Sequence, residues 1–142
     1  MRVVALEHAV AAPLCTRHLA DLGAEVIKIE RPGEGDFARG YDRFVRGISS
    51  FVVWLNRGKR SVTLDLKHQA ARAVLERLIE RADALVQNLA PGAAARLGLS
   101  YEALGPRHPR LVVCDISGYG ESGPYARKKA YDLLIQAESG LI

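Results

Sequence analysis

Two kinds of apolar pattern alternate along the chain. Short, β-branched runs are typical of buried strands, whereas apolar residues spaced three or four positions apart are typical of helices that pack on one face. The patterns predict strands over residues 2–6, 25–30, 60–66, 84–86 and 111–116, the last of them buried. They predict helices around Pro13, over residues 67–81, from Pro91 onward and over residues 131–139. This alternation predicts an α/β fold, with an open, mostly parallel sheet and helices on both faces.

Residues 31–47 interrupt this pattern. The segment is rich in glycine and arginine, too polar to be core, and long for a loop in a compact domain. Long loops of this kind usually serve a function or are disordered. The segment starts directly after a predicted strand, at residues 30–36 followed by Arg39, where open α/β sheets bind ligands. Its arginines either bind an anion through paired hydrogen bonds or form local pairs with the neighbouring carboxylates.

Two further segments leave a similar choice open between an anion contact and an ordinary turn. Residues 56–61 place three cations around Gly58, either as an exposed turn or as a contact with an anionic ligand. Residues 87–92 lead into a predicted helix with Arg96 one turn further on. Free N–H groups at a helix start, with an arginine nearby, can hold an anion. A Pro-Gly turn explains the same residues equally well.

Residues 118–123 read Gly-Tyr-Gly-Glu-Ser-Gly, a literal G-x-G-x-x-G after a predicted strand. In a dinucleotide-binding fold this motif occupies the first turn from strand to helix, and an acidic residue follows about 20 positions later. Here the motif follows a late strand, and Pro124 comes next. The context therefore favours a loop that glycine permits over an NAD site.

Composition narrows the classes of function. The chain has 142 residues, 49% of them apolar and 25% charged, which is typical of one folded domain. A net charge of +4 favours an anionic ligand. The basic residues form no single helical stripe and only 6% of residues are aromatic, which argues against nucleic-acid binding.

The spacing of cysteines and histidines predicts no metal site. Cys15 and Cys114 have no Cys-x-x-Cys or histidine spacing, so two buried free thiols in a reducing compartment are expected. His8 follows the first strand and can line a cleft, and no Ser-His-Asp set can be assembled. No run approaches the roughly 20 apolar residues that span a bilayer, and the start is too polar for a signal peptide. We therefore expect a cytoplasmic protein.

Taken in order, these segments resemble the class III CoA-transferases, the family of formyl-CoA transferase, carnitine CoA-transferase and α-methylacyl-CoA racemase. The resemblance covers nearly the whole chain and settles the glycine motif against NAD. It rests on residues 11–13, 22–32, 35–36, 39, 56, 59–61, 64–67, 88, 91–92, 118–120, 123–125, 131–132, 136–137 and 140. It implies a Rossmann-like domain that binds coenzyme A (CoA), the N-terminal part of a larger fold whose chains interlock as a homodimer.

The resemblance also implies which residues contact CoA. Arg31 would contact the nucleotide end, residues 64–67 would bracket the adenine, and residues 88–90 with Arg96 would hold the diphosphate and pantetheine. The family often has glutamine at the position of Val10, which leaves a side-chain contact there open. The full implied set is His8, Ala9, Val10, Ala11, Arg31, Leu64, Asp65, Leu66, Lys67, Asn88, Leu89, Ala90, Arg96, Lys129 and Tyr131.

The family's reaction implies an acyl-CoA and a small carboxylic acid as substrates, with no tightly bound cofactor. An aspartate attacks the thioester, which gives a mixed anhydride and then an enzyme–CoA thioester. The incoming acid then receives the CoA from this thioester. In the family this aspartate lies well after the Tyr-Asp motif, here Tyr131-Asp132, so we expect it beyond Ile142 and assign no catalytic residue. The apolar ending at residues 140–142 likewise suggests a truncated sequence.

These observations favour CoA transfer between acyl-CoA thioesters and free carboxylic acids, with residues 1–142 as the N-terminal CoA-binding α/β domain. An acyl-CoA racemase of the same fold is one alternative. The resemblance implies that racemases have Gly-His-Asp where this chain has Ala130-Tyr131-Asp132, and that their histidine acts as the base. Tyrosine, with an ordinary pKa near 10, is a poor replacement for that base. A non-catalytic CoA-binding fragment is the other alternative. The sequence does not reveal the acyl group or the acceptor acid.

Overall fold

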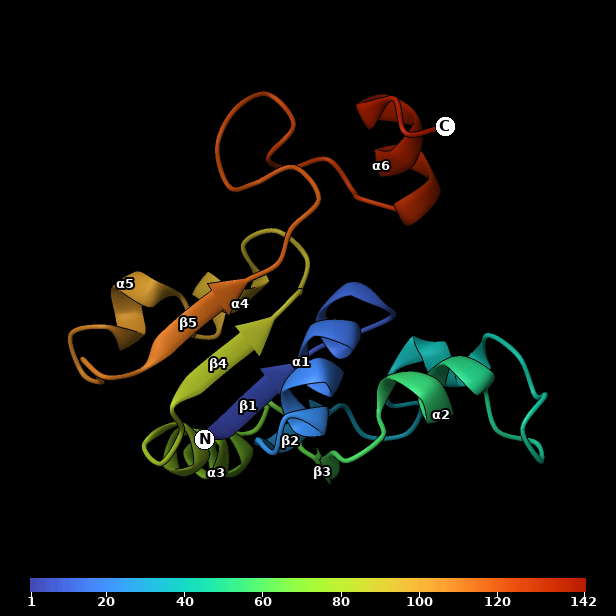
Figure 1. Cartoon of the computed structure of the whole chain (residues 1–142). Coiled ribbons are helices and arrows are strands. Elements are labelled where there is room, and N and C mark those ends of the chain that lie inside the picture. The colour runs from blue at the N-terminus through green and yellow to red at the C-terminus, as the bar shows by residue number, and fades with distance from the viewer.

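The computed structural model describes residues 1–142 as a parallel sheet covered by helices, followed by a helix that stands apart from the sheet (Figure 1). Five strands pair in the order β3-β2-β1-β4-β5, and each pairing is parallel. They are β1 (Arg2–Leu6), β2 (Glu25–Glu30), β3 (Arg60–Thr63), β4 (Ala84–Gln87) and β5 (Val112–Asp115). The predicted α/β class is therefore confirmed.

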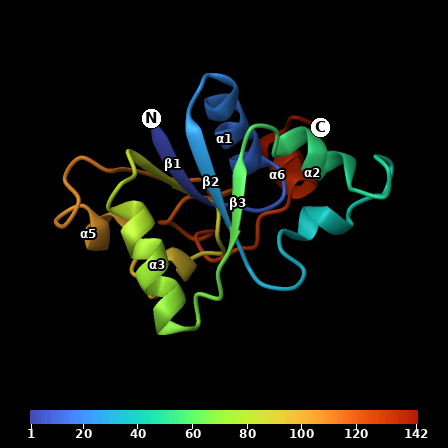
Figure 2. The ribbon, with the colours of Figure 1, turned by 90° about the horizontal axis from the view of Figure 1, so that it is seen from below.

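Helices connect the strands and cover both faces of the sheet. Figure 2 shows α1 (Ala11–Asp21) on one face and α3 (Gln69–Ile79) on the other. The shorter helices are η1 (Phe37–Gly40, a 3-10 helix), α2 (Ser50–Leu55), α4 (Ala93–Arg96), α5 (Tyr101–Leu104) and α6 (Asp132–Ser139). None of the helices has the length and apolar character that crossing a membrane requires.

The central strand β1 is apolar on both faces, which places it in the middle of the sheet. Successive side chains of a strand point to opposite faces. Val4 accordingly belongs to a core cluster with Leu75 of α3, whereas Val3 belongs to a second cluster with Ala12 of α1. The core thus lies above and below β1, and the strand ends are left free to carry a site.

The structure corrects three local expectations. The strand expected to be buried over residues 111–116 is an edge strand that pairs only with β4, and Val112 is 64% exposed. Residues 31–47 are not wholly outside the core, because Asp36 and Ala38 are buried. The two free cysteines are half-buried instead of buried.

Candidate functional site

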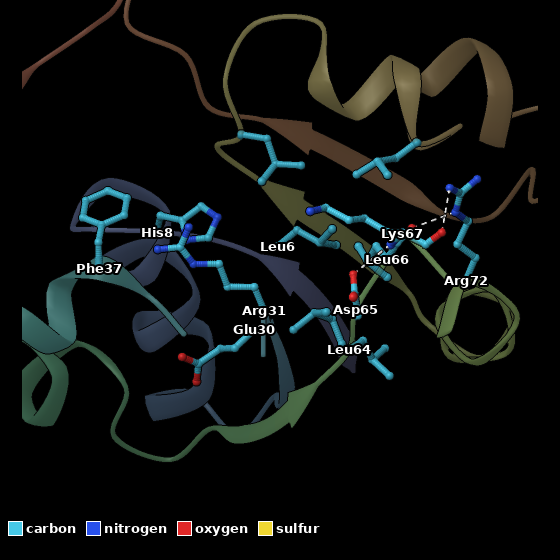
Figure 3. Close-up of a pocket in the computed structure, with 13 residues that line it drawn as sticks. Leu6, His8, Glu30, Arg31, Phe37, Leu64, Asp65, Leu66, Lys67 and Arg72 are labelled. Carbon is cyan, nitrogen blue, oxygen red and sulfur yellow. Dashed lines mark hydrogen bonds between the residues drawn. The ribbon is translucent and has the colours of Figure 1, made fainter. Parts of the chain in front are cut away.

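A cleft of about 420 Å³ opens at the carboxyl ends of the first four strands (Figure 3). Leu6 ends β1, Glu30 ends β2, residues 64–67 follow β3, and Leu89 follows β4. In the observed strand order the chain reverses its direction of winding between β1 and β4. Open α/β sheets bind ligands at such a point. The cleft therefore lies where this topology predicts a ligand.

Most of the cleft wall is apolar, with polar side chains among the apolar ones. The apolar lining consists of Leu6, Ile29, Phe37, Leu64, Leu66, Leu89 and Leu97. The polar lining consists of His8, Glu30, Arg31, Asp65, Lys67 and Arg72. An apolar wall packs rings and alkyl chains, while a few polar groups fix the orientation of the ligand. The combination suits a ligand with both apolar and anionic parts.

The three basic side chains of the cleft differ in how strongly they are engaged. Arg72 donates from Nε to the Leu66 carbonyl at 2.7 Å. Arg31 donates from Nε to the Gly35 carbonyl at 3.0 Å and from Nη2 to the exposed carboxylate of Glu34 at 3.0 Å. The Lys67 amino group has no partner within the chain, and its side chain extends over the cleft in Figure 3. Lys67 is therefore the cation most available to an anionic ligand, and the Arg31 guanidinium is half exposed beside it.

The structure brings part of the expected CoA-binding set together. The members that line the cleft are His8, Arg31, Leu64, Asp65, Leu66, Lys67 and Leu89. The members that do not line it are Ala9, Val10, Ala11, Asn88, Ala90, Arg96, Lys129 and Tyr131. CoA contacts at all of these positions stay predictions.

Asn88 acts on the cleft through the backbone of His8. Its Oδ1 accepts the His8 N–H at 2.8 Å, and its Nδ2 donates to the His8 carbonyl at 2.9 Å. The His8 ring stacks on Phe37, with ring centroids 5.7 Å apart. Burial lowers the pKa of His8, and the nearby Asp36 carboxylate partly opposes this shift. His8 is therefore a neutral imidazole at pH 7, held at the cleft by its backbone and its ring.

A buried network of opposite charges lies beside the turn that follows β1. Lys59 Nζ donates to Glu7 Oε1 at 2.6 Å, and the Thr16 hydroxyl donates to the other Glu7 oxygen. Lys28 Nζ donates to Asp36 Oδ2 at 2.7 Å and lies 3.8 Å from Glu7 Oε1. All four charged side chains are almost inaccessible to solvent. Burial lowers the pKa of Lys59, and the Glu7 carboxylate opposes that shift.

The structure bears out the exposed-turn interpretation of residues 56–61 for Arg57 and Gly58 and corrects it for Lys59. Lys59 is neither an exposed turn residue nor a ligand contact, because its amino group is directed inward to a carboxylate. The Asn56 side chain also faces inward, where its Oδ1 accepts a hydrogen bond at 3.0 Å from the network's other lysine. Arg57 and Arg60 form exposed ion pairs instead. The segment therefore supports the fold beneath the cleft.

Glu30 ties the long loop to the end of β2. Its Oε1 accepts from Arg39 at 2.6 Å and from Ser61 at 2.7 Å, and its Oε2 accepts the Asp36 N–H at 2.9 Å. The Arg39 guanidinium holds the pKa of Glu30 at about 2, well below its usual value. Gly35 is required beside it, because its φ is +65° and an added Cβ would lie 2.6 Å from Glu30 Oε2. The local pairs expected as one possibility in this segment are thus present, between Arg39 and Glu30 and between Arg31 and Glu34.

The glycine-rich residues 118–123 form an exposed loop late in the chain. The first turn from strand to helix, where a dinucleotide motif would lie, is residues 7–10 and contains no glycine. The late loop leads to Lys129 and Tyr131, both exposed and outside the cleft lining. The glycine motif therefore has no structural support as an NAD site.

Gly118 controls where this last segment lies. A Cβ at this position would come within 2.3 Å of the Ala130 Cβ and 3.0 Å of Ile135 Cδ1. We expect Gly118→Ala to displace residues 129–131 together with α6, at a cost of about 1 kcal/mol in stability. Limited proteolysis should then cut residues 119–131 faster than in the wild type.

Gly40→Ala is the matched control for this substitution. An added Cβ at Gly40 meets nothing within 4 Å, and its φ lies outside the left-handed region. We expect proteolysis of the Gly40 variant to match the wild type. Equal cutting of the Gly118 and Gly40 variants would contradict the steric role of Gly118.

Comparison with known proteins identifies the family. The sequence pattern of CoA-transferase family III matches residues 1–142. The chain belongs to this family. It is 43% identical over 140 residues to acetyl-CoA:oxalate CoA-transferase of Acetobacter aceti, a match that covers 99% of this chain and 36% of that protein. It is 37% identical over 143 residues to succinyl-CoA:glutarate CoA-transferase of Mus musculus, covering 100% of this chain and 33% of that protein.

Solved structures show the same fold. A CAIB/BAIF family protein of Brucella suis superposes with a TM-score of 0.91 at 37% identity, over 99% of this chain and 38% of that one. The hypothetical protein Rv3272 of Mycobacterium tuberculosis gives a TM-score of 0.90 at 38% identity, over 99% of this chain and 39% of that one. The chain thus spans little more than a third of its relatives. The predicted family and the Rossmann-like N-terminal fold are confirmed.

Several cleft residues escape prediction from the sequence. They are Leu6, Ile29, Phe37, Arg72 and Leu97, whereas Glu30 belongs to the segment singled out at the end of the second strand. Leu6 ends β1, so the strand-end argument that singles out Arg31 could have found it. Arg72 and Leu97 reach the cleft only through the packing of α3 and of the residue that follows α4, which no local pattern reveals.

Proposed function

We propose that residues 1–142 form the CoA-binding part of an enzyme that transfers CoA between acyl-CoA thioesters and free carboxylic acids. The observation that carries this proposal is the cleft, in which an apolar wall meets the unpaired Lys67 and the exposed Arg31. CoA has matching parts, because its adenine and pantetheine pack on apolar side chains and its phosphates accept charge-assisted hydrogen bonds. The names of the relatives support the same activity.

The cleft suggests how CoA would lie. Arg31 and Lys67 suit its phosphates, and the apolar side chains of Leu64 and Leu66 suit the adenine ring. The expected contacts at Asn88 and Ala90 and in the last segment would need CoA to extend out of the cleft past the end of β4. We propose this course for the pantetheine, which leads the thioester toward the rest of the complete protein.

We also propose that the nucleophile is an aspartate from a part of the complete protein outside residues 1–142. Asp132 is exposed at the start of α6, where its Oδ2 accepts a hydrogen bond from Gln136 at 2.6 Å. The attacking carboxylate would acquire the acyl group as a mixed anhydride and release CoA as its thiolate. That thiolate would then attack the enzyme's carbonyl, free the first acid and leave an enzyme–CoA thioester for the acceptor acid. Tyr131, in place of a racemase histidine, supports transfer over racemisation.

We further propose that the complete protein is a cytoplasmic homodimer acting on small carboxylic acids. The half-buried free thiols suit a reducing compartment. Exposed apolar side chains between η1 and the end of α2 support a further packing partner, with Phe44 87% and Trp54 46% exposed. Oxalate and glutarate in the names of the relatives support a small acid as acceptor.

Changing Arg31 to alanine should weaken CoA binding roughly tenfold, because a charge-assisted hydrogen bond to phosphate is lost. Adding Arg96→Ala should weaken binding further if the expected second contact exists. Isothermal titration of the complete protein with CoA measures both effects. Binding by the wild type should also fall as salt rises, because salt screens the exposed cations.

Arg77→Ala is the matched control for the arginine substitutions. Arg77 is exposed on α3 and does not line the cleft, so its removal should leave the CoA affinity unchanged. Unchanged affinity of a folded Arg31→Ala protein would remove Arg31 from the site. A wild-type protein that binds no CoA would refute the proposed function itself.

A further inference from the structure

The turn that places His8 at the cleft contains a backbone conformation that needs support. Ala9 has a φ of 60°, in the left-handed region that residues other than glycine rarely adopt. His8 and Ala9 lie between β1 and α1, so the conformation of Ala9 sets the direction in which the chain leaves His8. Such a conformation persists only where the surrounding structure holds it.

Asp36 supplies that support. Its Oδ1 accepts the Ala9 N–H at 3.1 Å and the Ala38 N–H at 3.0 Å, and its Oδ2 accepts from Lys28 Nζ at 2.7 Å. The side chain is 2% exposed, so water cannot take over these bonds. Burial alone would raise the pKa of Asp36, but the hydrogen bonds from Lys28 and the backbone amides hold it below its usual value. Asp36 is therefore a carboxylate at neutral pH.

Asp36 is itself fixed by its neighbours. Its backbone N–H donates to Glu30 Oε2 at 2.9 Å, which anchors it to the end of β2. Its partner Lys28 also donates to Asn56 Oδ1 at 3.0 Å, at the end of α2. Segments far apart in the sequence thus converge on one carboxylate, and that carboxylate holds the turn that follows β1.

We propose that Asp36 is a positioning residue for CoA binding, which holds Ala9 in its left-handed conformation and so keeps His8 at the cleft. The inference rests on the proposed function, because the cleft is the proposed CoA site. Asp36 does not line the cleft, so its effect on CoA passes through other residues. Two routes exist, one through Ala9 to His8 and one through Phe37, which follows Asp36 in the chain. An experiment can separate them.

Asp36→Ala should weaken CoA binding by the complete protein about tenfold, because the Ala9 N–H loses its partner and the turn is free to relax. Adding Ala9→Gly to this variant should raise its CoA affinity again by about threefold, since glycine adopts positive φ without strain. Ala9→Gly alone completes the double-mutant cycle. Hydrogen–deuterium exchange of a peptide covering residues 7–14, followed by mass spectrometry, should be faster in Asp36→Ala than in the wild type.

Asp36→Asn separates the Ala9 hydrogen bond, which it keeps, from the charge and the Lys28 hydrogen bond, which it removes. Asparagine keeps a side-chain oxygen for the Ala9 N–H, so this variant should bind CoA within about threefold of the wild type. The CoA affinity of Asp36→Asn relative to the wild type tests the inference even where Asp36→Ala does not fold. A loss in Asp36→Asn as large as tenfold would assign the effect to the pair with Lys28 instead of the Ala9 hydrogen bond and overturn the inference.

Two other results would also overturn it. One is equal CoA affinity of the wild type and a folded Asp36→Ala variant. The other is an affinity of Asp36→Ala that Ala9→Gly does not improve, which would favour the route through Phe37. Failure of the proposed function is distinct from these, because it appears as a wild-type protein that binds no CoA.

Discussion

Replacing Lys59 with methionine should destabilise the protein by about 3–5 kcal/mol, among the largest effects expected of one substitution. Lys59 Nζ lies 2.6 Å from Glu7 Oε1, and both side chains are almost inaccessible. Methionine removes the cation, so the buried Glu7 carboxylate keeps only the Thr16 hydroxyl and Lys28, 3.8 Å away, to offset its charge. Equilibrium unfolding in urea measures the change in the free energy of unfolding.

A second substitution separates the loss of charge pairing from the loss of shape. Lys59→Met combined with Glu7→Gln removes both charges, and replacing a buried ion pair by neutral groups is often close to neutral. We therefore expect the double variant to recover most of the stability. Arg60→Met is the matched control, because Arg60 forms an exposed pair with Glu25 and such pairs contribute about 0–1 kcal/mol. A cost for Lys59→Met no larger than for Arg60→Met would contradict the prediction.

The central strands are the part of the fold that the sequence predicts best. β1 and β2 have the predicted bounds, residues 2–6 and 25–30. β1 carries an unbroken apolar run after Arg2, and β2 is marked by its β-branched residues although Lys28 interrupts them. β3 ends at Thr63 instead of residue 66, because its pairing with β2 stops where Thr63 meets Glu30. The end of a strand thus depends on its partner, which the strand's own residues do not reveal.

Two of the short helices, α2 and α5, escape the pattern for a different reason. α2 reads Ser-Phe-Val-Val-Trp-Leu, a continuous apolar run without helical spacing, and only Leu55 of it is buried. α5 has four residues, from Tyr101 to Leu104, which is too few to show a period. Helices of one or two turns are stabilised by what they pack against, so their own residues do not predict them.

The residues of the site also differ in whether a local sequence pattern can predict them. Arg31 can be predicted because a residue that follows a parallel strand lies at the ligand-binding edge. The role of Lys59 cannot, because its partner Glu7 is 52 residues away and each looks like a surface charge in its own segment. The two meet only in the folded chain, beside α1, where Thr16 donates to Glu7 and the Pro13 carbonyl accepts a hydrogen bond from Lys59. Residues that support the cleft are therefore harder to predict than residues that line it.

Acid should weaken the attachment of the long loop to β2 through Glu30. The pKa of Glu30 is about 2 against an ordinary 4.5, chiefly because Arg39 donates hydrogen bonds to both of its oxygens. A carboxyl with a lower pKa in the folded state stabilises the fold fully above about pH 4.5 and loses that stabilisation as the pH falls toward 2. Because Arg39 is 47% exposed and solvent screens the pair, we expect a contribution of about 2 kcal/mol.

Glu30→Gln isolates this contribution. At pH 7 the variant should be less stable than the wild type by about 2 kcal/mol, and the difference should shrink as acid protonates the wild-type carboxylate. Urea unfolding at a series of pH values between 7 and 2.5 or so gives both curves. Glu34→Gln, in the same loop but with a side chain 86% exposed, should follow the wild type throughout. A Glu30→Gln deficit that stays constant with pH would mean that the shape of Glu30, and not its charge, holds the loop.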